Sequence, residues 1–311
     1  DDKKGLTVVE IMEAIHEDRI KGMYILGENP AMSDPDLNHA RRALQMLNHL
    51  VVQDIFLTET ATYADVIFPA SAWPEKNGTV TNTNRQVQMG RKAIDSPGLA
   101  KEDWWITNEL GKRMGLNWNY RHPKDIYKEM SQTMPSLNNI SWDRVKKESS
   151  VTYPSKSPTS PGDEIVFGDQ FPNETGKGKF VPASVTSPDE IPDKDFAMIL
   201  TTGRQLEHWH TGAMTRKASN LDAIEPEATV SISPHEILKK NMKPGDKIRV
   251  STRRGSINIR LREDRSIPEG VIFLPFCYNE AAANLLTNSA LDPYGKIPEF
   301  KYCAAKIEKI D

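Results

Sequence analysis

Three short apolar runs in the first seventy residues constrain the fold of this chain more than any other feature. The runs are GMYILG (22–27), HLVVQDIF (49–56) and ADVIFPA (64–70). Between the first two, Leu37, Leu44 and Leu47 recur at spacings that share one helix face, and a short helix is expected over 58–64. Strands that alternate with helices through short connections pair in parallel. The first part of the chain is therefore predicted to form an open α/β sheet.

Cap and turn residues predict where the elements of this region begin and end. Asp34 is expected to cap a helix that has Pro35 at its first position. Asn77 and Gly78 are predicted to form the turn of a hairpin. Further helices are expected over 8–17, 103–116 and about 123–134.

The character of the chain changes after this region. Serine and proline are frequent from about residue 135 to 192, which predicts an extended connecting segment, with a disordered linker as the alternative. Short apolar runs separated by turns such as KPGDK and RRGS then follow, which indicates a small β-barrel. The predicted organisation is an α/β domain over 1–135, a connecting segment over 136–192 and a β-barrel domain over 193–311.

Composition excludes several classes of protein. The formal net charge of −3 over 311 residues gives no broad basic surface for nucleic acid. No apolar run approaches the ~20 residues that a membrane-spanning helix needs. Cys277 and Cys303 form neither a CxxC motif nor a zinc-type spacing. A disulfide between them remains open, but so few thiols favour a reducing compartment, and we expect a cytoplasmic location.

Polar residues follow the first two predicted strands, where open parallel sheets bind ligands. These residues are Gly27, Glu28 and Asn29 after the first strand and Gln53 and Asp54 after the second. Gly27 lets a ligand approach the backbone, and Asp54 is suited to accept hydrogen bonds from a ribose or a guanine. Ser33 and the first amides of the next helix are suited to a phosphate. The pattern favours a nucleotide-like ligand, with ordinary turns as the alternative, and neither GxGxxG nor GxxxxGK[ST] is present.

The segment TTGRQLEHWHTGAMTR (201–216) concentrates cationic and aromatic side chains. Arg204 offers a fork of donors suited to phosphate, and His208 and His210 would face the same side of a strand. Contact with an anion or cofactor, metal binding and a purely structural role remain open for the histidine pair, and no acid or cysteine at a suggestive spacing supports a metal. No GxSxG motif, distinctive acid pair or activated cysteine marks a catalytic group.

Five colinear motifs resemble the C-terminal half of molybdopterin-dependent formate dehydrogenase catalytic subunits, in the molybdopterin oxidoreductase superfamily. They are MYILGENPAMSDPD, LVVQDIFLTETATYADVIFPA, EKNGTVTNTNRQVQ, TTGRQLEHWHTGAMTR and NEAAANLLTNSALDPYGKIPEFKYCAAKIE. The resemblance runs from residue 5 to 309, and HWHTG and KIPEFKYCA favour formate dehydrogenase over nitrate reductase. It implies part of an α/β domain followed by a six-stranded, double-psi β-barrel that binds molybdopterin dinucleotide.

The resemblance also implies a cofactor and its binding residues. The cofactor is bis(molybdopterin guanine dinucleotide) with molybdenum or tungsten. The residues implied around one guanine dinucleotide are Gly27, Glu28, Asn29, Ser33, Gln53, Asp54 and Asp103. Those implied at the pterin and phosphates are Thr202, Arg204 and His208, with Phe276, Asn284 and Lys301 lining the cofactor further on. Arg204 and Lys301 suit a diphosphate because both are cations, whereas His210 has a weaker claim.

The same resemblance places the catalytic groups elsewhere. The [4Fe–4S] ligands, the metal-ligating cysteine or selenocysteine and the catalytic histidine and arginine belong to an N-terminal half that this sequence lacks. We therefore expect a fragment that is inactive alone. The whole enzyme would oxidise formate to CO2 and pass two electrons through the metal to iron–sulfur clusters, then to subunits carrying Fe–S or flavin. The alternatives are a nitrate reductase-like enzyme, a respiratory-complex subunit and a non-catalytic cofactor-binding module.

Overall fold

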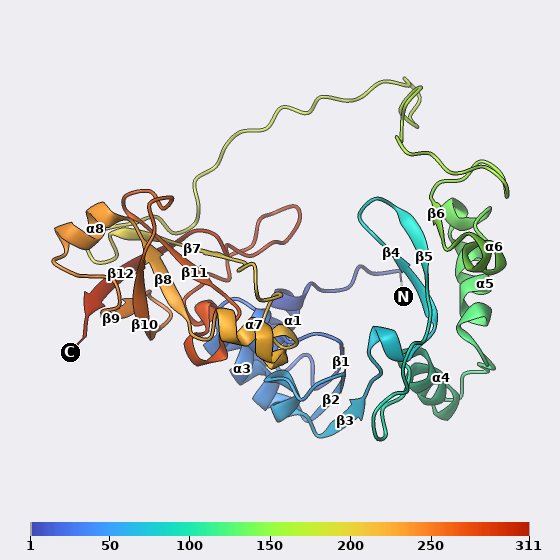
Figure 1. Cartoon of the computed structure of the whole chain (residues 1–311), viewed down its shortest axis with the longest axis horizontal. Coiled ribbons are helices and arrows are strands. Elements are labelled where there is room, and N and C mark those ends of the chain that lie inside the picture. Colours follow the sequence, from blue (N-terminus) through green and yellow to red (C-terminus); the bar gives the residue numbers. More distant parts are fainter. Residues whose placement is uncertain (1, 311) are drawn as a thin grey trace. The chain divides into compact units, whose positions relative to one another are not determined.

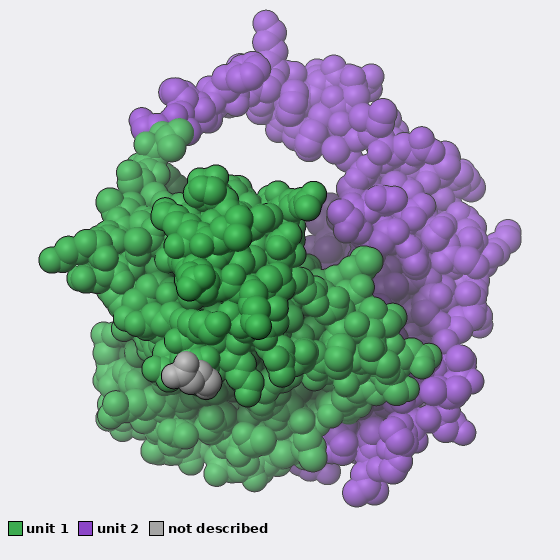
Figure 2. Space-filling model, turned by 60° about the vertical axis from the view of Figure 1, so that its left-hand side comes forward, with its two compact units in different colours: residues 1–67, 185–311 green, residues 68–184 purple. Residues whose placement is uncertain are grey.

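The computed structural model describes residues 2–310, which divide into two compact units (Figures 1 and 2). Unit 1 combines residues 1–67 with residues 185–311, and unit 2 comprises residues 68–184. The first unit therefore joins the beginning of the chain to its last part. Figure 2 colours unit 1 green and unit 2 purple.

A parallel sheet and two helices form the α/β part of unit 1. The strands are β1 (Gly22–Leu26), β2 (His49–Asp54) and β3 (Val66–Pro69), in the order β1-β2-β3. Strands β1 and β2 pair in parallel, as the alternation of runs predicts. Their inward residues, including Ile25, Leu50 and Val52, pack in one core with α1 (Val8–His16) and α3 (Leu37–Met46). The α/β class predicted from the sequence is confirmed.

The start of α3 differs from the prediction. A short helix, α2 (Pro30–Ser33), ends before Asp34, and the N-cap of α3 is Asp36, whose carboxylate accepts a hydrogen bond from the His39 amide at 3.5 Å. Asp34 has an extended backbone with ψ of 149°. An extended backbone would suit a cap, but Asp36 adopts the left-handed conformation with φ of 44° and ψ of 65°, so the helix begins after it, at Leu37, and not at Pro35. The prediction of Asp34 as the cap was wrong.

Six strands close into a barrel in the second part of unit 1. They are β7 (Met198–Gly203), β8 (Thr229–Ile232), β9 (Lys247–Ser251), β10 (Ser256–Glu263), β11 (Val271–Pro275) and β12 (Cys303–Lys309). The order β10-β8-β11-β7-β12-β9 mixes parallel and antiparallel pairs. Alternate residues of β10, namely Ile257, Ile259 and Leu261, are buried in the barrel core. The predicted six-stranded barrel is confirmed, and closure removes exposed strand edges. Along the chain, α7 (Ser219–Ile224) lies in the connection from β7 to β8, and α8 (Pro234–Lys239) lies in the connection from β8 to β9.

The barrel and the α/β part of unit 1 meet along a packed seam. The Asn284 side-chain amide donates to the backbone carbonyls of Met32 at 2.9 Å and Ser33 at 3.1 Å. Met32 and Leu37 pack against Ala282 in a small apolar cluster. Buried hydrogen bonds and apolar contact together hold the strand ends of the sheet beside the barrel.

Unit 2 combines a small antiparallel sheet with three helices. The strands are β4 (Gly78–Thr81), β5 (Gln86–Gly90) and β6 (Ser150–Thr152), and the helices are α4 (Asp103–Arg113), α5 (Pro123–Thr133) and α6 (Trp142–Glu148). The β4–β5 turn lies at residues 82–85, where the Asn82 side chain accepts from the Gln86 amide at 3.0 Å and Arg85 has φ of 63°. Gly78 instead begins β4, opposite Gly90. The prediction of a hairpin turn at Asn77 and Gly78 was wrong, because the hairpin of this region turns at residues 82–85.

The remaining regular elements are short. The 3-10 segments are η1 (Thr60–Tyr63), η2 (Trp73–Glu75), η3 (Pro135–Leu137), η4 (Thr215–Lys217), η5 (Asn279–Ala281) and η6 (Ala283–Leu285). Within the segment expected to be extended, α6 and β6 occupy the first part, and residues 153–197 contain no helix or strand. None of the helices within residues 2–310 combines the length and apolar composition needed to span a bilayer.

Candidate functional site

The carboxyl ends of β1 and β2 lie side by side at one edge of the sheet. The Gly27 amide donates to the Gln53 carbonyl at 2.9 Å. Gly27 has φ of +64°, and no atom lies within 4 Å of the position that a Cβ would take. This backbone is therefore open to a flat ligand, and its conformation favours glycine. The Gln53 side chain is buried and accepts a hydrogen bond from the Tyr24 hydroxyl.

Two other residues at this edge use hydrogen bonds to shape the fold. The buried Asn29 side chain donates to Glu59 at 2.8 Å and accepts from the backbone and hydroxyl of Thr60 at 3.1 Å and 2.7 Å. Asp54 accepts from the backbone amides of Ile55 and Phe56, at 2.6 Å and 3.3 Å. The predicted residues thus come together, and they also fix the loops that follow β1 and β2.

Asp34 is a buried carboxyl that the sequence motifs did not mark. Its side chain is 4% exposed, and Oδ2 has no hydrogen-bond partner among residues 2–310. Burial, and then the negative charge of Glu28, raise the pKa of Asp34 to about 7. Ser33 ends α2 immediately before it, so the amides of a following helix are not at Ser33 as the sequence suggested.

On the barrel side, two cations lie against one aromatic ring. The Arg204 guanidinium lies 6.0 Å from the centre of the Phe276 ring, and Lys301 Nζ lies 5.4 Å from the same centre. Lys301 Nζ also donates to the Thr202 carbonyl at 2.6 Å. Within residues 2–310, no carboxylate forms an ion pair with either cation. Burial, and then the charge of Arg204, lower the pKa of Lys301.

His210 joins this group, which we call the cation cluster (Arg204, His210 and Lys301 around Phe276). The His210 ring lies 6.4 Å from the Phe276 ring, centre to centre. Burial lowers the pKa of His210, Arg204 lowers it further, and Glu28 opposes this shift. Glu28 follows β1, and its charge acts on His210. This effect indicates that the strand ends lie near the cation cluster.

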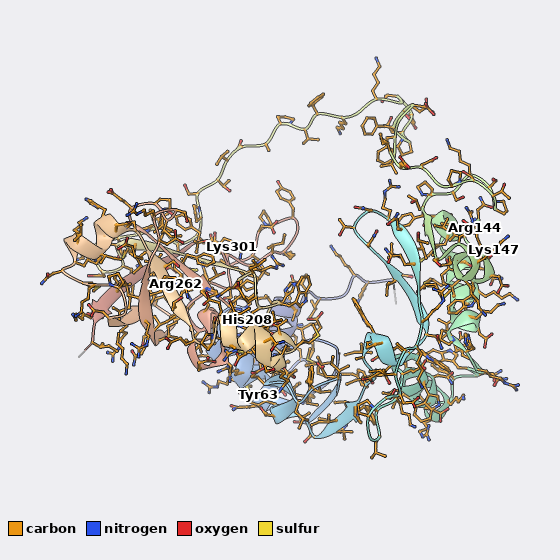
Figure 3. All side chains as sticks on the ribbon, in the orientation of Figure 1. Tyr63, Arg144, Lys147, His208, Arg262 and Lys301 are labelled. Carbon is orange, nitrogen blue, oxygen red and sulfur yellow. The ribbon has the colours of Figure 1, made fainter. Side chains whose placement is uncertain are left out.

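His208 occupies a different environment from His210. Its buried ring places Nε2 2.8 Å from the Glu225 carbonyl and packs edge-on against Tyr278, whose hydroxyl donates to the same carbonyl at 3.0 Å. Strand β7 ends at Gly203, so the two histidines do not share a strand face, and that prediction was wrong. Figure 3 labels His208 and Lys301 in the barrel part of unit 1.

Arg216 fixes the loop that carries both histidines, and no sequence motif indicated a role for this arginine. Its guanidinium pairs with Asp222 at 2.5 Å and Glu280 at 2.9 Å, and lies 4.7 Å from the centre of the Tyr278 ring. It also donates to the Pro226 carbonyl at 3.2 Å. These partners stand up to 64 residues away in the chain, so no local pattern could identify them.

Comparison with known proteins decides the family. The Molybdopterin oxidoreductase family matches residues 1–113, and the molybdopterin dinucleotide binding domain matches residues 198–304. The chain belongs to the molybdopterin oxidoreductases. The two matches fall on the α/β and barrel parts that meet in unit 1, although the first also extends into unit 2.

Relatives of this molybdopterin oxidoreductase are longer than the chain itself. The F420-dependent formate dehydrogenase subunit alpha of Methanocaldococcus jannaschii is 44% identical over 98% of this chain and 46% of its own length. The F420-dependent formate dehydrogenase 2 subunit alpha of Methanococcus maripaludis is 41% identical over 98% of this chain and 45% of its own length. The assimilatory nitrate reductase catalytic subunit of Bacillus subtilis is 33% identical over 98% of this chain and 44% of its length. The chain thus spans about half the length of these relatives.

A solved structure supports the fold. Acetylene hydratase from Pelobacter acetylenicus matches with a TM-score of 0.78 over 96% of this chain and 46% of that chain, at 20% identity. At this identity the likeness concerns the fold alone.

The donor set of unit 1 fits a molybdopterin dinucleotide. Arg204 and Lys301 lie against the same Phe276 ring without a carboxylate counter-charge among the described residues, and burial, followed by the charge of Arg204, lowers the pKa of Lys301. A diphosphate would neutralise both cations and accept their hydrogen bonds. Gly27 leaves open space at the strand ends, where flat rings could lie.

The remaining predicted residues have further partners. Asn284 holds the seam, and the Thr202 hydroxyl donates to the Phe300 carbonyl at 2.8 Å. Asp103 lies in unit 2, where it forms an ion pair with Lys76 beside a cavity of about 240 Å³ that Trp104 and other residues line. No group of three or more metal-ligating side chains occurs in the described part of the chain.

Neither cysteine is an activated nucleophile. Cys277 and Cys303 are free, buried thiols. Burial raises the pKa of Cys277 to about 11 and also raises that of Cys303. A thiol with a raised pKa is protonated at neutral pH and reacts slowly. Neither thiol is therefore suited to nucleophilic chemistry.

Proposed function

We propose that unit 1 binds the guanine dinucleotide part of a molybdopterin cofactor within a formate dehydrogenase catalytic subunit. The observation that carries this proposal is the cation cluster, in which Arg204 and Lys301 face one ring without a carboxylate partner in residues 2–310. Phosphate groups are the usual counter-charge for such paired cations.

The proposed roles divide between the two sides of the site. Arg204, Lys301 and the nearby His210 hold phosphates, and Thr202 and Phe276 support Lys301. Asp54 accepts hydrogen bonds from guanine N–H groups, and Gly27 leaves room for a ring system. The other proposed contacts, carried over from the family motifs, are Glu28, Asn29, Ser33, Gln53, His208 and Asn284.

The proposed reaction belongs to the whole subunit. The bound cofactor would supply the redox chemistry, a two-electron oxidation of formate to CO2 with release of one proton, while the residues of this chain hold its dinucleotide part. We place the metal-ligating cysteine or selenocysteine and the [4Fe–4S] ligands in the remaining half of the subunit, so this chain alone is expected to be inactive. Relatives 40–44% identical that are named formate dehydrogenases support formate as the substrate. Electrons would leave through subunits with Fe–S or flavin, in the cytoplasm, where two buried free thiols persist.

Nitrate reduction is the second candidate, because the Bacillus subtilis assimilatory nitrate reductase catalytic subunit is 33% identical. Assays of the complete, metal-loaded enzyme with formate and with nitrate separate the two. Turnover of nitrate without formate oxidation would contradict the substrate proposal. Metal analysis of the same sample distinguishes molybdenum, tungsten and a metal-free subunit.

Calorimetric titration of the 311-residue chain with GDP tests the binding proposal directly. Arg204→Gln is expected to weaken GDP binding about tenfold, because one charge-assisted contact to phosphate is lost. Arg260→Gln is the matched control, since Arg260 lies on the barrel and already pairs with Glu227 at 3.2 Å. GDP binding that is absent in the wild type, or equally weakened by both variants, would overturn the proposal.

A further inference from the structure

Helices α4 and α5 of unit 2 (Figure 1), together with the connection that joins them, line a cavity that the proposed function does not use. Its volume is about 480 Å³. Trp104 and Asn108 line it from α4, Trp118 and Tyr120 line it from the connection, and Met130 lines it from α5. Binding sites for small molecules have volumes of about 300–1,000 Å³ and mostly apolar walls. The cavity is therefore large enough for a small ligand.

The aromatic walls of the cavity are held by contacts within unit 2. A Cβ on Gly111 would lie 2.2 Å from the Trp118 ring, so this ring packs directly on α4. The Tyr120 hydroxyl donates to the Glu129 carboxylate on α5. The rings of Trp118 and Tyr120 lie 6.2 Å apart, centre to centre. The connection thus contacts both helices through its aromatic side chains, which fixes the shape of the cavity.

Asn108 places an unused hydrogen-bond acceptor in the wall of this cavity. Its side chain is 3% exposed, and its Oδ1 atom has no hydrogen-bond partner among residues 2–310. Its Nδ2 group donates to the Tyr120 carbonyl at 3.5 Å, which is long for such a bond and holds the amide only weakly. A buried acceptor without a partner costs free energy, and a donor inside the cavity would remove that cost.

The lining residues define the chemistry of a ligand that fits. Trp104, Trp118 and Tyr120 present rings against which a flat ring packs favourably. None of the described residues that line the cavity is lysine or arginine, so a phosphate group would find no counter-charge there. We propose that the cavity binds a neutral, planar heteroaromatic compound whose ring N–H donates to Asn108 Oδ1. The site is independent of the function proposed for unit 1.

An ordered water molecule is the other donor that would satisfy Asn108, and the experiment must separate the two. Indole and benzofuran do so, because their ring systems have nearly the same shape and an ether oxygen replaces the N–H group in benzofuran. A ligand N–H that bonds to Asn108 makes indole the tighter binder. If water satisfied Asn108 instead, the two compounds would bind equally.

NMR titration of the full 311-residue chain, labelled with 15N-tryptophan, tests the proposal. The chain has six tryptophans, whose indole N–H signals are assigned with single Trp-to-Phe variants. Indole is expected to shift the signals of Trp104 and Trp118 saturably and to bind several-fold more tightly than benzofuran. Trp73 and Trp209 serve as internal controls, because they lie outside the cavity and are 77% and 59% exposed. No saturable shift at Trp104 and Trp118, or equal affinity for the two compounds, would overturn the proposal.

Asn108→Leu removes the acceptor and keeps a side chain of similar volume. It should lower the affinity for indole several-fold and abolish the preference for indole over benzofuran. Asn117→Leu is the matched control, since Asn117 belongs to the same connection, is exposed and does not line the cavity. Unchanged indole binding by folded Asn108→Leu would refute the proposed contact. If Asn108→Leu does not fold, the comparison of indole with benzofuran on the wild-type chain decides the question.

GDP provides the last comparison. It should neither shift the signals of Trp104 and Trp118 nor displace indole, because the cavity offers no cation to a phosphate. Displacement of indole by GDP would assign the cavity to the nucleotide and overturn the inference. Absence of GDP binding altogether would contradict the function proposed for unit 1 and leave the heteroaromatic site standing.

Discussion

The two sides of the candidate site use their polar residues differently. At the strand ends, Asn29 and Gln53 are buried, and their side chains bond to neighbouring loops or strands. On the barrel side, Arg204 and Lys301 lie over Phe276 without a carboxylate partner within residues 2–310. The difference indicates that the sheet supplies shape to the site and the barrel supplies charge. Variants on the sheet side should change stability, and variants in the cation cluster should change ligand binding.

Asp34→Asn should have the largest effect on stability, and the effect should depend on pH. Folding raises the pKa of this buried acid to about 7, from an unfolded value near 3.8. Between these two values the folded chain holds a proton that the unfolded chain releases. The free energy of unfolding therefore falls as pH rises from about 4 to about 7. The difference of about three pKa units sets an upper limit of ~4 kcal/mol.

Urea unfolding of wild type and Asp34→Asn between pH 4 and pH 8 measures this effect. The free energy of unfolding of the variant is expected to rise relative to that of the wild type as pH increases. The difference between the two should become constant above about pH 7. A difference that stays the same at every pH would show that Asp34 ionises normally in the folded chain. Asp36→Asn is the control, because Asp36 is a partly exposed cap.

Asn29→Ala should destabilise unit 1 by about 3 kcal/mol, since it leaves buried partners on Glu59 and Thr60 unsatisfied. GDP affinity of the folded variant should fall much less than that of Arg204→Gln. Thermal unfolding and titration of the same sample measure both quantities. A variant that is fully stable but does not bind GDP would contradict the claim that the sheet side shapes the site and the barrel side binds the ligand.

The two histidines offer an internal comparison. His208→Ala should cost about 2 kcal/mol, because it empties a buried space against Tyr278 and removes the bond to the Glu225 carbonyl. His210→Ala should leave stability nearly unchanged and weaken GDP binding several-fold, because His210 belongs to the cation cluster. The opposite result, with His208 controlling affinity, would reassign the two roles.

Gly27→Ala should have the smallest effect. Its positive φ is unfavourable for alanine, which predicts a loss of about 1 kcal/mol, while the space around its Cβ position is open. If the ring of a ligand lies over Gly27, the added methyl group should also weaken GDP binding in titration. Unchanged affinity would place the ligand elsewhere along the strand ends.

The sequence predicted the architecture because its signals are local and repeated. Alternating apolar runs indicated the parallel sheet, and closely spaced strands indicated the barrel, as the structure confirms. Local signals failed where several residues of the same type compete. Asp34 and Asp36 both suit a cap, and only the left-handed backbone of Asp36, which local sequence does not reveal, decides between them.

The site was predicted as a set of residues, while their neighbours depend on the tertiary fold. The motif around Arg204 pointed to the barrel side, but both histidines follow the end of β7 at Gly203, and His208 and His210 have different neighbours. The link between Arg216 and Glu280, and the effect of Glu28 on His210, join residues far apart in the chain. No periodicity or spacing encodes such contacts.

The position of β12 in the barrel has a consequence for biosynthesis. This strand inserts between β7 and β9, and Lys301 lies just before it. A ribosome must therefore deliver residues 303–309 before the barrel can close and bring Lys301 beside Arg204. A nascent chain that ends before Lys301 carries only Arg204 of this pair, so the proposed binding of an anionic cofactor would require translation to have passed Lys301 and the strand that follows it.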